Sequence, residues 1–204
     1  MEQTKENKMG VMPVNKLLVT MSLPIVISML IQAMYNLVDS VFVAQINPDA
    51  LTAVGMAFPM QSLMIAFQTG LGVGMNALVS RYLGQKKPYE AGLAATHSLI
   101  LTALNYVVFL IVGLTALPAF FSIQTHSEVI ANYGVEYLSI VCCGSFGLFF
   151  QIYGERILQA TGKTLLSMVS QILGAVINIV LDPIFIFGVD FLGIPAMGVT
   201  GAAI

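Results

Sequence analysis

Long stretches without a charged residue limit what this 204-residue sequence can fold into. A helix needs about 20 predominantly apolar residues to cross the hydrocarbon core of a bilayer. Five stretches reach that length, and a sixth apolar stretch begins near residue 197. Their approximate limits are 17–43, 51–79, 91–117, 129–152 and 165–187. The sequence therefore predicts a protein that crosses a membrane several times.

These stretches are expected to be helices, because backbone groups in lipid must be hydrogen-bonded within their own segment. The short alternating strands of a membrane β-barrel are absent from the sequence. The first stretch is also too long for the hydrophobic region of a cleaved signal peptide. We predict an all-α, polytopic membrane helix bundle with five full transmembrane helices and the start of a sixth, preceded by a polar tail at residues 1–16.

All the basic residues fall on one side of this topology. They are Lys5, Lys8, Lys16, Arg81, Lys86, Lys87, Arg156 and Lys163. The loops on the opposite side contain Asp49, Glu128 and Asp190 but no Lys or Arg. Because Lys and Arg concentrate in cytoplasmic loops, the N-terminus is predicted to be cytoplasmic.

Composition and motifs argue against several classes of protein. Charged residues make up 9% of the chain and the formal net charge is −2, so it lacks the basic surface that binds nucleic acid. Cys142 and Cys143 are adjacent in an apolar stretch, which suits neither a disulfide framework nor a zinc site. Neither HExxH nor Gly-x-Ser-x-Gly occurs. We expect no enzyme, cofactor or nucleic-acid partner.

Three carboxylates lie within the predicted helices, where a charge costs several kcal/mol and therefore suggests a function. Asp39 and Asp182 lie four and five residues before the outer ends of the first and fifth stretches. At about 1.5 Å per residue, the two are at similar depth. Glu136 follows the start of the fourth stretch and is expected at the wet outer interface.

Each aspartate also ends a polar stripe along one helix face. The stripes are Gln32, Asn36 and Asp39, and Gln171, Asn178 and Asp182. At about 100° per residue, each stripe falls within roughly 40° of one face. The two stripes would bury their polar groups by facing one water-filled cavity, although polar residues also join membrane helices without any ligand. Thr200, at the start of the sixth stretch, is expected at the same depth.

Prolines and glycines within the stretches predict local backbone effects. Pro24, Pro59 and Pro183 free carbonyl groups and allow a helix to bend beside a cavity. The spacing of Gly70, Gly72 and Gly74 is similar to that of a nucleotide-binding loop, but no strand precedes it. Close helix packing is the favoured explanation.

Several segments together resemble the multidrug and toxic compound extrusion (MATE) family, bacterial branch, in the order expected along the chain. They are Pro24 to Asp39, Leu51-Thr-Ala-Val-Gly55 with Pro59, Ser80-Arg-Tyr-Leu-Gly-Gln-Lys86, Leu158-Gln-Ala-Thr-Gly-Lys-Thr164, Asn178-Ile-Val-Leu-Asp-Pro183 and Gly198-Val-Thr-Gly-Ala-Ala203. The resemblance implies an antiporter of the cytoplasmic membrane that exports organic cations or other amphipathic compounds. It implies that protons or sodium ions flowing inward drive the export.

The resemblance also implies a site in the N-terminal lobe, formed by residues that match Gln32, Asp39, Asn178, Asp182 and Thr200. We assign ion coupling to Asp39, Asp182, Asn178 and Thr200, and the substrate cavity to Gln32 and Asn36. An apolar cavity disfavours the charged form of a carboxylate, which permits proton exchange. The same four coupling residues offer oxygen ligands for sodium, and the sequence leaves both ions open.

The family has twelve helices in two lobes, so residues 17–204 correspond to its N-terminal lobe and a second six-helix lobe is missing. A longer protein or a separate chain would supply it. Three alternatives remain: a flippase for lipid-linked oligosaccharides, a half-length accessory subunit, and a hydrolase in which Asp39 and Asp182 share a proton. No Lys or Arg lies inside a predicted span, which disfavours the cationic cavity of a flippase. The Gly-x-Gly-Asp context of a membrane aspartyl protease is absent.

Overall fold

The computed structural model describes residues 12–45, 48–188, 198 and 200–201, except for the side chains of Asp39 and Val43. The described residues form α-helices and no strand. The helices are α2 (Val14–Ala44), α3 (Pro48–Gly84), α4 (Pro88–Thr115), α5 (Leu117–Gln124), α6 (Glu128–Ala160) and α7 (Thr164–Phe187). All of them except α5 are long and apolar enough to cross a membrane. The predicted all-α membrane bundle is confirmed.

Two boundaries differ from the sequence prediction. The fourth span was expected to end at residue 152, but α6 continues to Ala160 and so contains Arg156. Lys16 lies in the first turn of α2 and Arg81 in the last turn of α3. The statement that no Lys or Arg lies inside a span is therefore wrong for the helices as the structure has them. In addition, the expected outer loop at 118–128 contains α5, which begins with a proline in its first turn, where the missing N–H costs nothing.

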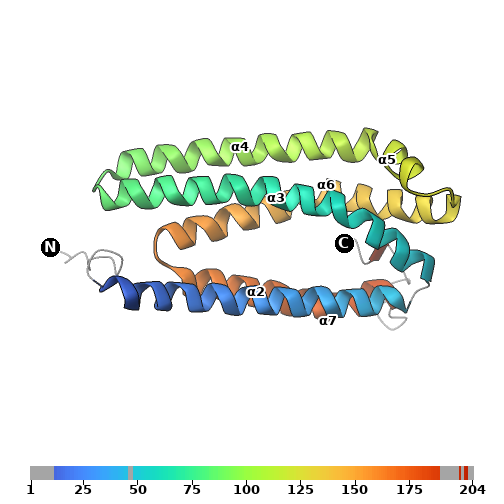
Figure 1. The fold of residues 1–204 in the computed structure, drawn as a ribbon, viewed down its shortest axis with the longest axis horizontal. Coiled ribbons are helices and arrows are strands. Elements are labelled where there is room, and N and C mark those ends of the chain that lie inside the picture. Colours follow the sequence, from blue (N-terminus) through green and yellow to red (C-terminus); the bar gives the residue numbers. More distant parts are fainter. Residues whose placement is uncertain (1–11, 46–47, 189–197, 199, 202–204) are drawn as a thin grey trace.

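Successive long helices run in opposite directions (Figure 1). The start of α2, the α3–α4 connection and the α6–α7 connection all lie at the same end of the molecule. The described basic residues Lys16, Arg81, Lys86, Lys87, Arg156 and Lys163 lie toward this end. We refer to it as the cytoplasmic end, following the predicted orientation.

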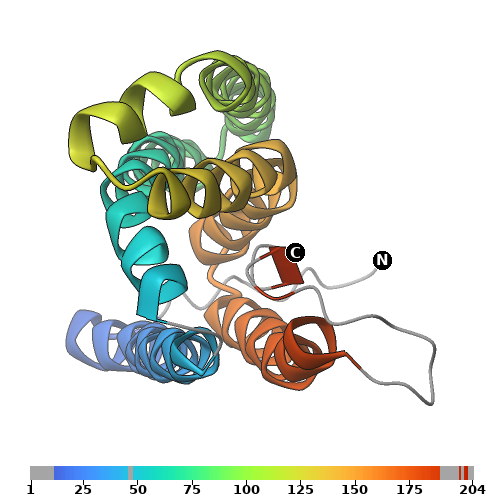
Figure 2. The ribbon, with the colours of Figure 1, turned by 90° about the vertical axis from the view of Figure 1, so that its right-hand side faces the viewer.

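The long helices fall into two sets, visible end-on in Figure 2. In the three-helix group, α3 packs against α4 and α6, and α5 covers one end of α6. In the α2–α7 pair, the two helices pack mainly against each other and make fewer contacts with the rest. Most of the buried apolar core belongs to the three-helix group and includes Met64, Phe109, Leu138 and Phe149.

A buried amide ties the three-helix group together. Gln68 on α3 is fully buried and donates to the Thr102 hydroxyl of α4 and to the Phe149 carbonyl of α6, both at 3.1 Å. Asn105 of α4 donates in turn to the Gln68 side-chain oxygen at 3.3 Å. Hydrogen bonds of this kind join neighbouring membrane helices.

Close helix packing is confirmed for one of the three glycines singled out above. A Cβ atom on Gly72 would lie 2.7 Å from Cγ of Arg156, whereas Gly70 and Gly74 have no atom within 4 Å of that position. Gly72 therefore makes room on α3 for the Arg156 side chain of α6. Pro24, Pro59 and Pro183 all lie inside helices that continue through them.

Candidate functional site

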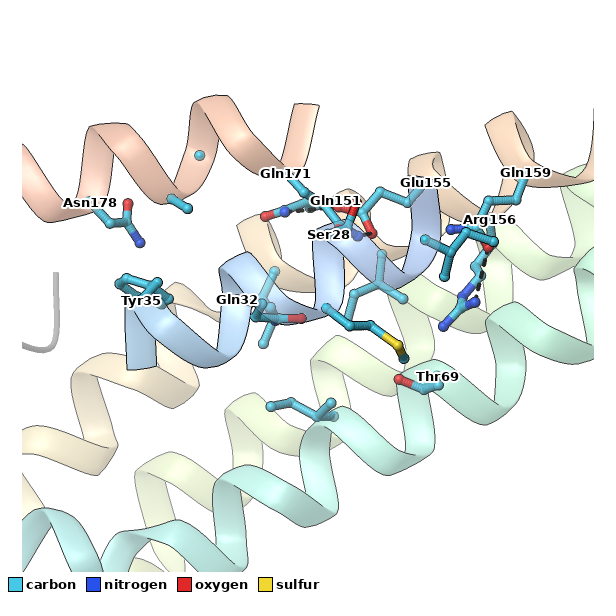
Figure 3. Close-up of a pocket in the computed structure, with 17 residues that line it drawn as sticks. Ser28, Gln32, Tyr35, Thr69, Gln151, Glu155, Arg156, Gln159, Gln171 and Asn178 are labelled. Carbon is cyan, nitrogen blue, oxygen red and sulfur yellow. Dashed lines mark hydrogen bonds between the residues drawn. The ribbon is translucent and has the colours of Figure 1, made fainter. Parts of the chain in front are cut away.

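A cavity of about 410 Å³ lies between α2, α3, α6 and α7 (Figure 3). Its polar lining comes from all four helices: Ser28, Gln32 and Tyr35 of α2, Thr69 of α3, Gln151, Glu155, Arg156 and Gln159 of α6, and Gln171 and Asn178 of α7. The apolar lining includes Ile25, Met29, Ile65 and Ile152. The α2–α7 pair thus forms one wall of the cavity and the three-helix group forms another.

The structure brings members of both predicted polar stripes to this cavity. Gln32 from the first stripe and Gln171 and Asn178 from the second line it. Asn36, which we assigned to the same cavity, instead lines a neighbouring cavity of about 580 Å³ between α2, α3 and α6. The two cavities adjoin, because Tyr35, Ile65 and Leu148 line both. The functional roles of these residues stay a prediction.

Asp182 lies on α7, within the α2–α7 pair, and lines neither cavity. Its Oδ2 atom is buried and has no hydrogen-bond partner in the described part of the chain. Asp39 lies on the facing helix α2, but its side chain is outside the described residues. A buried carboxylate oxygen needs a proton, a cation or a donor to offset the loss of water.

Thr200 makes a contact that the sequence did not predict. Its hydroxyl donates to the carboxylate of Glu136 on α6, whose side chain is exposed. The position of Glu136 at the outer interface stays a prediction. The expected start of the sixth span lies outside the described residues except for Gly198, Thr200 and Gly201. The backbone N–H of Gly198 donates to the Ile186 carbonyl at 3.1 Å, which places Gly198 beside the end of α7.

Sequence reasoning missed a polar cluster on the last turns of α6. Gln151 donates to Glu155 at 3.0 Å, and Arg156 donates to Gln159 at 3.0 Å. Two further bonds reach α7, from Gln171 to Glu155 and from Gln159 to Ser167. The cluster was missed because the fourth span was ended at residue 152. The spacing of Gln151, Glu155 and Gln159 at i, i+4 and i+8 could have revealed a polar helix face.

Within the described residues, no group of three His, Cys, Asp or Glu side chains could hold a metal ion. The proposed sodium ligands include Asp39, whose side chain is not described, so this set stays a prediction. Most of the polar side chains that line the 410 Å³ cavity carry hydroxyl or amide groups. Ligands bind in sites of this kind through a few polar groups set among apolar walls.

Five helices in the described part of the chain are long and apolar enough to cross a membrane, and a partly polar cavity lies between four of them. These features define a multi-pass membrane protein with a candidate ligand site. The MatE family model matches residues 24–184, which is most of the sequence. The chain belongs to the MatE family, and the resemblance noted in the sequence is confirmed.

Relatives with known names support this membership. The chain is 27% identical over 192 residues to the "FAD transporter" of Shewanella oneidensis, covering 94% of this chain and 42% of that protein. It is 28% identical over 191 residues to the "Multidrug export protein MepA" of Staphylococcus haemolyticus, covering 93% of this chain and 41% of that one. The chain thus spans less than half the length of these relatives.

Solved structures give the same result for the fold. A MOP superfamily transporter from Pyrococcus furiosus superimposes with a TM-score of 0.89 at 34% identity, covering 99% of this chain and 44% of that one. For that transporter, a reverse polarity of the binding pocket suggests a different function. The MATE multidrug transporter DinF-BH, solved as a complex, gives a TM-score of 0.86 at 31% identity, covering 98% of this chain and 44% of that one.

Proposed function

We propose that this chain is the N-terminal lobe of an ion-coupled antiporter that exports amphipathic organic compounds, including cations, across the cytoplasmic membrane. The observation that carries the proposal is the 410 Å³ cavity between the α2–α7 pair and the three-helix group. Its size falls in the range of about 300–1,000 Å³ that is usual for sites of drug-sized ligands. Relatives named as multidrug export proteins support export as the direction of transport.

Ion coupling is proposed to occur at Asp39 and Asp182, with Asn178 and Thr200 as neighbouring oxygen donors. The support is the buried Oδ2 atom of Asp182, which has no partner among the described residues and would be satisfied by a proton or a sodium ion. We favour protons, because the sequence offers no cation near Asp39 and an apolar surrounding disfavours its ionised form. Binding and release of the proton would then alternate between the two sides of the membrane.

The second lobe of the transporter is the expected partner of this chain, and the central cleft would lie between the two. A flippase for lipid-linked oligosaccharides is less well supported. Among the described residues that line the cavity, Arg156 is the one basic side chain, and the acidic side chain of Glu155 lies next to it in sequence. This is not the strongly cationic chamber that a pyrophosphate needs.

The coupling ion can be tested in everted membrane vesicles that contain the complete transporter. We expect that adding a cationic substrate dissipates an imposed pH gradient with no sodium present. Vesicles without the transporter control for passive proton leakage. If transport requires sodium and leaves the pH gradient unchanged, proton coupling is wrong while the assignment of the site residues could still hold.

A further inference from the structure

The cytoplasmic end of the 410 Å³ cavity contains a carboxylate that the proposed coupling site does not use. Glu155 lines the cavity from α6 and is 8% exposed. Figure 3 shows it at the opposite end of the cavity from Asn178. Because α6 runs toward the cytoplasmic end and α7 runs away from it, Glu155 is nearer to the cytoplasm than Gln32 and Asn178 are.

Among the described residues, two neutral amides donate hydrogen bonds to the Glu155 carboxylate. Gln151 donates to Oε1 at 3.0 Å and Gln171 donates to Oε2. The guanidinium group of the next residue, Arg156, donates to Gln159 instead, and its stem packs over Gly72 of α3. A carboxylate accepts up to about four hydrogen bonds when ionised, so two amides leave acceptor sites for a further ligand.

Part of the cavity wall suits the apolar portion of a ligand. Ile25 and Met29 of α2, Ile65 of α3 and Ile152 of α6 line the same cavity. Methionine is flexible and polarisable, so it adapts to apolar groups of different shape. Among the described residues that line the cavity, Glu155 is the one acidic group, and the basic group of Arg156 is hydrogen-bonded to Gln159. One acidic group beside apolar walls matches a ligand with a positive charge on a hydrophobic body.

We propose that Glu155 is the anchoring site for the charged group of an organic cation at the cytoplasmic end of the cavity, with Gln151 and Gln171 orienting the carboxylate. This inference rests on the proposed function and specifies where the lobe first holds its substrate. An organic cation fits better than a metal ion, because the two amides present N–H donors to Glu155 and the described residues contain no set of three acidic, His or Cys ligands. The hydrogen bond from Gln171 to Glu155 also connects this anchoring site to α7, the helix that carries Asn178 and Asp182.

The inference is tested with the complete transporter in lipid nanodiscs, by direct binding of two radiolabelled probes. Tetraphenylphosphonium is a permanent lipophilic cation, and triphenylphosphine oxide is a neutral molecule of related shape. We expect Glu155→Gln to raise the Kd for the cation at least tenfold and to leave the Kd for the neutral probe unchanged. Glu155→Asp, which keeps the charge, should retain most of the cation affinity. Glu90→Gln is the matched control, because Glu90 is exposed in the first turn of α4 at the same end.

Several results would overturn the inference. If Glu155→Gln binds the cation as tightly as the unaltered transporter, the charge is held elsewhere. If the variant loses both probes equally, or if Glu155→Asp loses as much cation affinity as Glu155→Gln, Glu155 only shapes the cavity. In these cases the proposed function stands as long as the unaltered transporter binds and exports the cation. If the unaltered transporter neither binds nor exports it, both proposals fail.

Discussion

The three-helix group and the α2–α7 pair are built differently, although all five long helices described above are apolar enough to cross a membrane. In the three-helix group, α3 buries eight of its residues, and Gln68 links α3, α4 and α6 through buried hydrogen bonds. In α7 the buried residues are Thr164, Ser167 and Ile186, and much of its surface is exposed. We therefore expect the three-helix group to be the more stable side of the cavity. The α2–α7 pair has fewer contacts with the other helices and can move with less loss of packing.

Most of the predicted functional residues lie in the less buried of the two sets, the α2–α7 pair. Gln32, Asn36 and Asp39 are on α2, and Asn178 and Asp182 are on α7. Regions that move during function are generally drawn from the less stable parts of a protein. We therefore expect substitutions of the predicted coupling residues in the α2–α7 pair to change transport, and substitutions in the buried core of the three-helix group to change stability.

The largest effect is expected from Asp39→Asn in the complete transporter. The amide keeps the shape of the side chain but cannot change charge, so ion-driven efflux should fall to background. The protein should remain folded and inserted, as measured by its yield and its elution in gel filtration. Asp49→Asn is the control, because Asp49 is exposed in the first turn of α3. Efflux at the unaltered rate would make Asp39 a structural residue.

A large effect on stability is expected from Phe149→Ala in the three-helix group. The Phe149 side chain is fully buried and packs edge-on against Phe109, so its removal leaves a cavity. The free energy of unfolding should fall by about 3 kcal/mol, measured by circular dichroism in mixed detergent micelles. Phe146→Ala, at a position 54% exposed, should change it much less. Equal losses in the free energy of unfolding at the two positions would contradict the view that buried packing stabilises the three-helix group.

A smaller effect on stability is expected from Gln68→Leu. The substitution leaves Thr102 and Asn105 without their bonds to the Gln68 side chain. We expect the free energy of unfolding to fall by about 1 kcal/mol, because a hydrogen bond between membrane helices contributes on average less than about 1 kcal/mol. The same unfolding experiment measures it, with Gln45→Leu at an exposed position as the control. Unchanged stability would mean that apolar packing alone holds α3, α4 and α6 together.

The sequence was sufficient to predict the helices and their order, because charge-free stretches of this length leave few other folds. It predicted that Gln32, Gln171 and Asn178 share a cavity, because helical periodicity fixes which residues occupy one face. The end of α6 was missed because polar residues that face a cavity resemble a loop, although the spacing of Gln151, Glu155 and Gln159 indicates a polar helix face. The contact of Gln171 with Glu155 depends on how α6 and α7 pack, which periodicity within one helix does not specify.

The close approach of Gly72 to Arg156 has a consequence for how the sequence can diverge. A side chain at position 72 would occupy the space of the Arg156 stem, so the two positions are not free to vary independently. If a short residue replaces Arg156, position 72 has room for alanine or serine. If Arg156 is kept, we expect both substitutions at position 72 to be unfavourable. Substitutions at these two sites should therefore be epistatic, and the order in which they arise should determine which intermediates are viable.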